Sequence, residues 1–390
     1  MSDPIVRIAA RGDGVSASGR HVPFGVPGDA IGEDGTLVAG PHHQLPPCRH
    51  FPECGGCQLQ HADDAAYRDY LASRVAHALA QHDLVTEVRD PHLSPSNSRR
   101  RAALRALKVG QGAVIGFNAA KSHRIVDMRE CHILRPELFA LVAPLRELLG
   151  RFLTAKRTGE IQLTLADQGP DVVLKGVDPD GLEAIETLTA FCERHRLARL
   201  SIDRGLGAET FYEPLPTTIT LSGTPVGLPA GSFLQATEDG EAALVAAVGE
   251  AVGEVAVTAD LFAGLGTFAL ALPGKLYAAE ASRDAVLALK SAAPAIAVDH
   301  RDLYRRPLDK GELDRFGAVV LDPPRAGAAE QITEIARSTV PRIAYISCNP
   351  ATFARDARTL ADGGYRLAWV RPVGQFRWST HVELAAAFSR

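Results

Sequence analysis

The chain has 390 residues, of which 46% are hydrophobic and 23% are charged, and its formal net charge is −4. These values are typical of globular proteins, and the length predicts two or three domains. No apolar run reaches the roughly 18 residues that a membrane-spanning helix requires, and the first residues lack the basic and apolar stretches of a secretory signal. We therefore expect a cytoplasmic globular protein and exclude collagen, coiled coils, disordered chains and membrane proteins.

The first 230 residues contain strand-like and helix-like runs in an irregular order. Residues 5–24 alternate apolar and polar side chains around turn-forming glycines, which predicts short strands. Helical periodicity follows at 64–84 and again at 185–195, where Cys192 lies on the apolar face and is expected to be a core thiol. Four further runs predict an antiparallel sheet, namely 100–107, 113–117, 160–166 and 172–177.

The last 150 residues show a more regular alternation. A helical stretch at 238–252 is followed by apolar, strand-like runs that are separated by helical segments. Such alternation predicts an α/β domain with a Rossmann-like, doubly wound sheet. The runs are 255–262, 275–279, 295–298, 317–321 and 342–347.

Positive charge is concentrated in one segment. Between Arg99 and Arg135 there are nine Lys or Arg residues against two acidic ones, a net charge of +7 in an otherwise acidic chain. A run of this kind is either a solvated face or a surface that follows the phosphates of a nucleic acid. The second alternative predicts that Arg99, Arg100 and Arg101 contact RNA phosphates.

A glycine-rich loop indicates a cofactor site. Residues 260–269 read Asp-Leu-Phe-Ala-Gly-Leu-Gly-Thr-Phe-Ala, follow a predicted strand and are expected to open a helix. The first strand-to-helix turn of such a sheet is where nucleotides bind, because glycines allow the backbone to approach the ligand. Glu280 ends the next strand and could accept hydrogen bonds from ribose hydroxyls. These features fit NAD and S-adenosylmethionine equally well.

Asp322 follows another predicted strand and precedes two prolines and Arg325. A carboxylate in this place points into the crevice above the sheet. The element resembles the fourth motif of S-adenosylmethionine-dependent methyltransferases. Those that methylate exocyclic amino groups have an aromatic residue where Arg325 stands, so the sequence argues against that acceptor.

Two further residues are candidates for covalent and proton-transfer chemistry. Cys348 ends the predicted strand 342–347 and would lie at the same edge as the glycine-rich loop, which favours a nucleophile over a core thiol. Glu383 lies within an apolar, strand-like run, where a carboxylate must be paired or used. The alternative for Glu383 is an ion-paired residue at a sheet edge.

Four of the six cysteines form a candidate metal site. Cys48, Cys54 and Cys57 lie within ten residues of one another, and Cys131 supplies a fourth thiol. Four thiolates can hold either Zn²⁺ or a [4Fe–4S] cluster, and the spacing alone does not distinguish them.

Three motifs together resemble the bacterial uracil-C5 RNA methyltransferases. They are Ser-Cys-Asn-Pro-Ala-Thr-Phe-Ala-Arg-Asp at 347–356, Asp-Pro-Pro-Arg-Ala-Gly at 322–327 and Thr-His-Val-Glu at 380–383. The resemblance implies that Cys348 adds to C6 of a uracil, which makes C5 nucleophilic, and that Glu383 removes the C5 proton after methyl transfer. It also implies that S-adenosylmethionine is bound by Gln235, Phe262, Gly264, Gly266, Thr267, Glu280, Asp302 and Asp322. Thr267 and Thr237 stand where the family often has asparagine.

The same resemblance implies a substrate, a cluster and a domain order. The ribosomal-RNA branch of the family carries a [4Fe–4S] cluster on this cysteine spacing, so we expect that cluster on Cys48, Cys54, Cys57 and Cys131, with zinc as the alternative. The expected substrate is a uridine of 23S ribosomal RNA, and we expect neither a membrane nor an obligate protein partner. We expect a truncated β-barrel-like segment at 1–42, an α+β RNA-binding domain at 43–230 and the catalytic domain at 231–390.

Other functions remain open from the sequence. A transfer-RNA uridine is an alternative substrate, although the four cysteines disfavour it. An NAD-dependent oxidoreductase would explain the glycine-rich loop but not Cys348, Asp322 or Glu383. A non-catalytic RNA-binding protein would explain the fold but not the presence of both Cys348 and Glu383.

Overall fold

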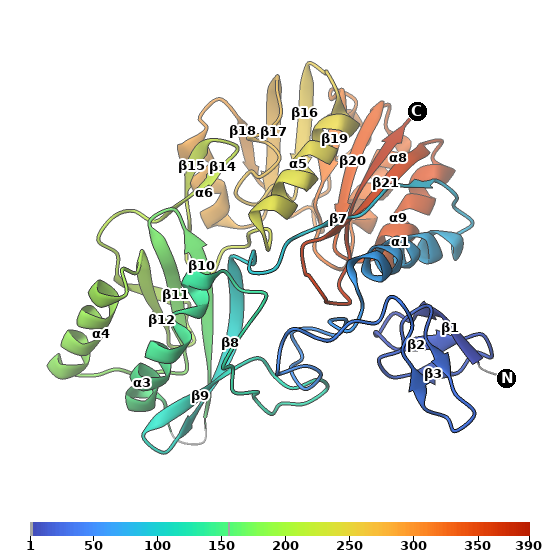
Figure 1. Ribbon diagram of the computed structural model, residues 1–390. Helices are drawn as coiled ribbons and strands as arrows, with labels where there is room; N and C mark the ends of the chain where they lie inside the picture. Colours follow the sequence, from blue (N-terminus) through green and yellow to red (C-terminus); the bar gives the residue numbers. More distant parts are fainter. Residues whose placement is uncertain (1–2, 155–156) are drawn as a thin grey trace. The chain divides into compact units, whose positions relative to one another are not determined.

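The computed structural model describes residues 3–154 and 157–390, and its contacts group the chain into two units (Figure 1). The first unit comprises 1–46, 58–94 and 239–390, and the second comprises 47–57 and 95–238. This grouping differs from the expected order of three segments, because residues 58–94 join the unit that contains the C-terminal sheet. The three-domain division therefore stays a prediction. In the described ranges, no helix is both long and apolar enough to cross a membrane.

The first unit is built on a large, mostly parallel sheet. Among the residues that the structure describes, nine strands form it in the order β18-β17-β16-β19-β20-β22-β21-β6, with β7 also paired to β21. The strands are β18 (Ala297–His300), β17 (Lys275–Glu280), β16 (Val257–Leu261), β19 (Ala318–Leu321), β20 (Arg342–Ser347), β22 (Glu383–Ser389), β21 (Arg366–Gly374), β6 (Glu87–Val88) and β7 (His92–Leu93). The strand order reverses between β16 and β19, which confirms the predicted doubly wound sheet.

Side chains of alternate strand residues pack on opposite faces of this sheet. Val319 and Ile343 face a core that includes α1, α8 and α9, whereas Val320 and Ala344 face a core that includes α5. The sheet is therefore buried on both sides, as a parallel sheet requires. The helices of this unit are α1 (Asp64–Ala80), α5 (Glu238–Val252), α6 (Arg283–Ala292), α7 (Lys310–Leu313), α8 (Ala329–Arg337) and α9 (Pro350–Asp362).

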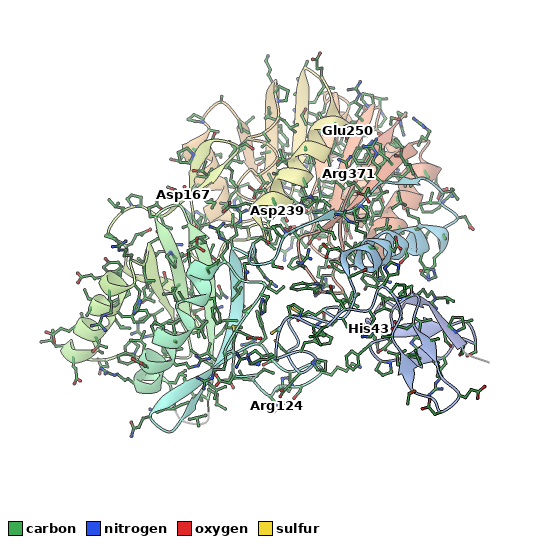
Figure 2. All side chains as sticks on the ribbon, viewed as in Figure 1. His43, Arg124, Asp167, Asp239, Glu250 and Arg371 are labelled. Atoms are coloured by element: carbon green, nitrogen blue, oxygen red, sulfur yellow. The ribbon has the colours of Figure 1, made fainter. Side chains whose placement is uncertain are left out.

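Ion pairs attach α5 to the sheet. Glu250 of α5 accepts from Arg89 at 2.6 Å and lies 3.8 Å from Arg371 of β21. Figure 2 labels Glu250 and Arg371 side by side on these elements. Arg89 also lies over the Trp369 ring at 4.1 Å, so the cation is held both by charge and by an aromatic face.

The N-terminal residues form a small antiparallel sheet of the order β3-β2-β1-β4-β5. A buried carboxylate fixes the segment that follows it. Asp29 accepts from the backbone N–H of Val26 at 2.8 Å, from that of Gly40 at 2.7 Å and from the Nδ1 of His43 at 2.8 Å (Figure 2). The expected barrel is not shown, because the described strand pairs form an open path. The strands are β1 (Asp3–Ile8), β2 (Gly14–Ser16), β3 (His21–Val22), β4 (Ala30–Ile31) and β5 (Leu37–Val38).

The second unit is an α+β fold around a mixed sheet of the order β13-β12-β11-β10-β8-β9. Its core contains Cys192, which is fully buried, as the sequence predicts. The strands are β8 (Arg101–Val109), β9 (Gly112–Gly116), β10 (Thr158–Ala166), β11 (Gly169–Lys175), β12 (Arg199–Asp203) and β13 (Ala208–Tyr212), and β14 (Thr218–Leu221) pairs with β15 (Thr224–Gly227). The helices are α2 (Pro136–Phe139), α3 (Val142–Phe152) and α4 (Leu182–Arg194).

The three consecutive arginines at 99–101 donate hydrogen bonds to backbone carbonyls. Arg100 is 2% exposed and donates to the carbonyl of Gln235 at 3.1 Å. Arg101 donates to the carbonyl of Leu234 at 2.7 Å, and Arg99 donates to the carbonyl of Arg101 at 2.9 Å. Burial removes Arg100 from the surface, whereas the contacts of Arg99 and Arg101 with RNA phosphates stay predictions.

Candidate active site

Cys348, Asp322 and Glu383 meet at one edge of the large sheet. Asp322 follows β19, Cys348 follows β20, and Glu383 begins β22, which runs antiparallel to β20. The pairing of Ser347 with Leu384 makes Cys348 and Glu383 neighbours across the two strands. Val320, Ile346 and Ala385 pack in the core that includes α5. Each lies two positions from one of the three site residues, so all three site residues lie on the face of the sheet that α5 covers.

The site is acidic, and burial changes its titration. Burial, with the nearby charge of Asp322, raises the pKa of Glu383 to about 8. Burial also raises the pKa of Asp322 to about 7. Burial, followed by the charges of Glu383 and Asp322, raises the pKa of the Cys348 thiol to about 11. The positive charge of Arg325 lowers the pKa values of Cys348 and Glu383 and so opposes both shifts. At neutral pH the cysteine of the ligand-free site is thus a thiol rather than a thiolate.

The Asp-Pro-Pro-Arg loop at 322–325 is hydrogen-bonded to the segment that follows Cys348. The side-chain amide of Asn349 donates to the carbonyl of Arg325 at 3.1 Å, and the Thr352 hydroxyl donates to the same carbonyl at 3.2 Å. Asn349 also caps α9, because its side chain accepts from the N–H of Ala351 at 3.1 Å. The Cys-Asn-Pro motif therefore fixes the position of the nucleophile candidate and the acidic loop together.

The glycine-rich loop is shaped by two carboxylates. Glu280 accepts from the N–H of Gly264 at 2.9 Å, and Asp260 accepts from the N–H of Ala269 at 2.9 Å. Gly266 has a φ of +94°, and a Cβ there would lie 2.5 Å from Leu289, so only glycine fits. Residues 262–272 form turns and a bend, which corrects the expected helix. The physical reason is that Asp260 binds the N–H of Ala269 in place of a helical carbonyl.

Asp260 is a member of the site that the sequence analysis did not single out. It is fully buried, and burial, together with the charges of Asp322 and Glu280, raises its pKa to about 8. The available signal was its position, since it is an acidic residue inside an apolar strand that leads directly into the glycine-rich loop.

Residues expected to hold an adenosine lie around the ends of β16 and β17. Phe262 adopts a φ of +63°, which places a non-glycine residue in the left-handed region. Its ring lies 5.5 Å from that of Tyr304. Asp302 accepts from the N–H of Tyr304 at 3.0 Å, and Thr267 lies partly buried in the glycine-rich loop. An aromatic pair and a carboxylate are suitable partners for an adenine ring.

Gln235 and Thr237 belong to the second unit, where both are buried. The contact with the cofactor that is expected of Gln235 therefore stays a prediction.

The four cysteines of the candidate metal site are also in the second unit. Burial raises the pKa values of Cys48, Cys54 and Cys131, and the charge of Cys131 adds to the shifts of Cys48 and Cys54. Arg99 interacts electrostatically with Cys57 and Cys131. Within the described part of the chain, however, no group of three or more His, Cys, Asp or Glu side chains is arranged so that it could hold a metal ion.

Glycines allow the cysteine loop to lie against β9 and the turn after it. A Cβ on Gly56 would lie 3.2 Å from the Phe117 ring, and one on Gly55 would lie 2.6 Å from the carbonyl oxygen of Asn118. The backbone of Cys54 forms an isolated antiparallel β-bridge with that of Ala119, next to these glycines.

The doubly wound sheet, the glycine-rich turn and the acidic residues at its switch point define a methyltransferase of the S-adenosylmethionine-dependent class. Comparison with known proteins gives the family. The family described as tRNA (Uracil-5-)-methyltransferase matches residues 295–390. The chain belongs to the RNA uracil-C5 methyltransferases, because a curated relative named for that activity is 31% identical over 91% of this chain, and another RNA methyltransferase matches it at 52% identity. This membership sets aside an NAD-dependent oxidoreductase and a non-catalytic RNA-binding protein.

Individual relatives differ in what their names specify. An uncharacterized RNA methyltransferase of Zymomonas mobilis is 52% identical over 99% of both chains. The 23S rRNA (uracil(1939)-C(5))-methyltransferase RlmD of Photorhabdus laumondii is 31% identical over 91% of this chain and 84% of that protein. The crystal structure of Pyrococcus abyssi tRNA (uracil-54, C5)-methyltransferase with S-adenosyl-L-homocysteine covers all of both chains with a TM-score of 0.74 and 23% identity, which shows a shared fold.

Proposed function

We propose that the protein methylates C5 of a uridine in 23S ribosomal RNA through a covalent bond between Cys348 and C6 of the uracil. The observation that carries this proposal is the meeting of Cys348 and Glu383 on one face at one sheet edge, beside Asp322. The RlmD relative supports ribosomal RNA as the substrate. The family description and the archaeal structure name transfer RNA instead, and that substrate is the second candidate.

The chain's own residues supply a nucleophile and a base. Cys348 loses its proton to solvent water and its sulfur bonds to C6, which moves the C5–C6 electron pair onto C5 and the O4 carbonyl. When bound, S-adenosylmethionine would supply the methyl group to C5, and its sulfur would keep the electron pair of the S–CH3 bond that breaks. Glu383 then takes the proton from C5, the electrons of that C–H bond restore the C5–C6 double bond, and the sulfur leaves C6. A carboxylate whose pKa is about 8 is a stronger base than an exposed one, which suits this step.

Adduct trapping tests the two roles. Cys348→Ala should abolish turnover while S-adenosylmethionine still binds, and Glu383→Gln should accumulate a methylated protein–RNA adduct that resolves slowly. Cys192→Ala, which changes a core thiol outside the site, is the matched control and should turn over normally. Methylation by Cys348→Ala would refute the covalent route, and the absence of any adduct with Glu383→Gln would refute the assigned base.

Mapping of 5-methyluridine identifies the substrate. Ribosomal and transfer RNA from cells with and without the gene are compared, and the proposal expects one 23S rRNA uridine to lose its methyl group. A loss confined to transfer RNA would overturn the ribosomal assignment and leave the chemistry intact.

We further propose that Cys48, Cys54, Cys57 and Cys131 hold a [4Fe–4S] cluster that stabilises the second unit. The support is the sequence resemblance, the interaction of Arg99 with Cys57 and Cys131, and the charge of Cys131 acting on Cys48 and Cys54. Anaerobically purified protein should contain about four irons per chain, and Cys54→Ser should lose them. Zinc without iron would restore the alternative metal, and neither metal would refute the site.

A further inference from the structure

Gln375 is a buried polar residue beside the catalytic base candidate that no motif includes. It follows β21 directly, is 1% exposed, and hydrogen-bonds through its side chain to Glu383. The pairing of Val373 with Glu383 explains the contact, because Gln375 lies two residues further along the strand direction and therefore on the same face.

The backbone on both sides of Gln375 is held in place. The carbonyl of Gly374 accepts from the N–H of Ser94 at 3.3 Å, and the carbonyl of Phe376 accepts from the Tyr67 hydroxyl at 3.0 Å. The same hydroxyl lies 3.1 Å from the carbonyl of Ser379. Tyr67 of helix α1 thus holds the backbone that connects β21 to β22, so the backbone of Gln375 has a defined position.

We propose that Gln375 is a positioning residue whose amide N–H donates to the Glu383 carboxylate, favours its charged form and holds it in one orientation for removal of the C5 proton. This inference rests on the proposed function. A neutral donor suits the task, because it stabilises the charged carboxylate without the full positive charge that would make it a weak base. Its hydrogen bond opposes the effects of burial and of Asp322, which raise the pKa of Glu383.

The charged and titratable groups around Glu383 define what else could move its titration. Cys348 lies across from it on β20, and Asp322 and Arg325 face it from the loop after β19. Because Gln375 does not titrate, a change in pH dependence on its replacement reports on Glu383 and these neighbours rather than on Gln375.

The test is the rate at which the methylated adduct resolves, measured in single turnovers between pH 6 and pH 10. Gln375→Leu should form the adduct, resolve it about tenfold more slowly at pH 7, and recover towards the wild-type rate at high pH. Gln375→Met, which keeps the length of the side chain and cannot donate, should show the same loss at pH 7 and the same recovery at high pH. This second variant also keeps the test valid if the leucine variant folds poorly.

Gln331→Leu is the matched control, since Gln331 is an equally buried glutamine of the same unit that bonds the backbone of Leu308. It should lower the melting temperature without changing the pH profile. A Gln375→Leu profile that is lowered equally at every pH, or one identical to wild type, would overturn the positioning role. Failure of wild-type protein and of Glu383→Gln to form any adduct would instead refute the proposed function.

Discussion

The reactivity of the Cys348 thiol tests the electrostatics of the site without any substrate. Burial and the neighbouring carboxylates raise the pKa of Cys348 from 9.0 to about 11. Only the thiolate reacts with an alkylating agent, so at pH 7.5 Cys348 should be modified about 100-fold more slowly than a thiol with the lower pKa. Iodoacetamide labelling followed by mass spectrometry of the Cys348 peptide measures this rate separately from the other cysteines.

Two substitutions should change the labelling rate in opposite directions. Glu383→Gln removes a negative charge and should speed labelling, but mainly above pH 8, because the pKa of Glu383 is about 8 and its carboxyl is largely neutral below that pH. Arg325→Gln removes the cation that lowers the pKa of Cys348 and should slow labelling. That effect should be about threefold or less, because Arg325 is exposed and its charge is screened.

The pH dependence is what makes this prediction decisive. A Glu383→Gln variant that labels faster by the same factor at pH 6.5 and pH 9 would contradict the titration assigned to Glu383. A variant that labels no faster at pH 9 would contradict the electrostatic contact itself. Labelling of the wild-type Cys348 peptide at the rate of an exposed thiol would refute the whole argument.

Three further predictions concern stability. Asp171→Asn should cost about 3–5 kcal/mol in denaturant unfolding, because Asp171 and Arg199 form a buried pair with bonds of 2.9 and 2.8 Å. Arg100→Met should lower the melting temperature and leave the salt dependence of RNA binding unchanged, since Arg100 is buried against the Gln235 carbonyl; a flatter salt slope would revive the phosphate contact. Asp260→Asn should raise the melting temperature more at pH 8.5 than at pH 5. The pKa of Asp260 in the folded protein is about 8, above its value in the unfolded chain, so the folded state binds the proton more tightly. The wild-type protein therefore loses stability as the pH rises from about 4 to 8. Equal effects at both pH values would contradict the raised pKa.

The secondary structure of the catalytic sheet was predictable because each strand is a short apolar run between turn-forming residues. The helix at 238–252 has the predicted bounds, and the five strand-like runs from 255 to 347 are all strands. The glycine-rich loop shows the limit of such patterns. Its glycines predict a turn, but they carry no information on the buried Asp260 carboxylate that replaces helical hydrogen bonding.

Charge patterns predicted less, because net charge does not specify burial. The arginines at 99–101 look like a cationic surface in the sequence, yet their donors match backbone carbonyls that only the folded second unit brings near. The role of residues 58–94 was missed for a similar reason. Nothing local in helix α1 indicates that Tyr67 binds carbonyls more than 300 residues away.

Cys348 and Glu383 could each be chosen from the sequence, but their proximity depends on the direction of one strand. Parallel strands place their carboxyl ends at one edge, which accounts for Asp322 and Cys348. A residue at the start of a parallel strand would lie at the opposite edge, so Glu383 reaches the cysteine only because β22 runs antiparallel to β20. Because β21 and β22 are antiparallel, the connection between them lies at the same edge as Glu383, and Gln375 at its start reaches the Glu383 side chain. A single reversed strand therefore completes a site that the parallel part of the sheet leaves without a base.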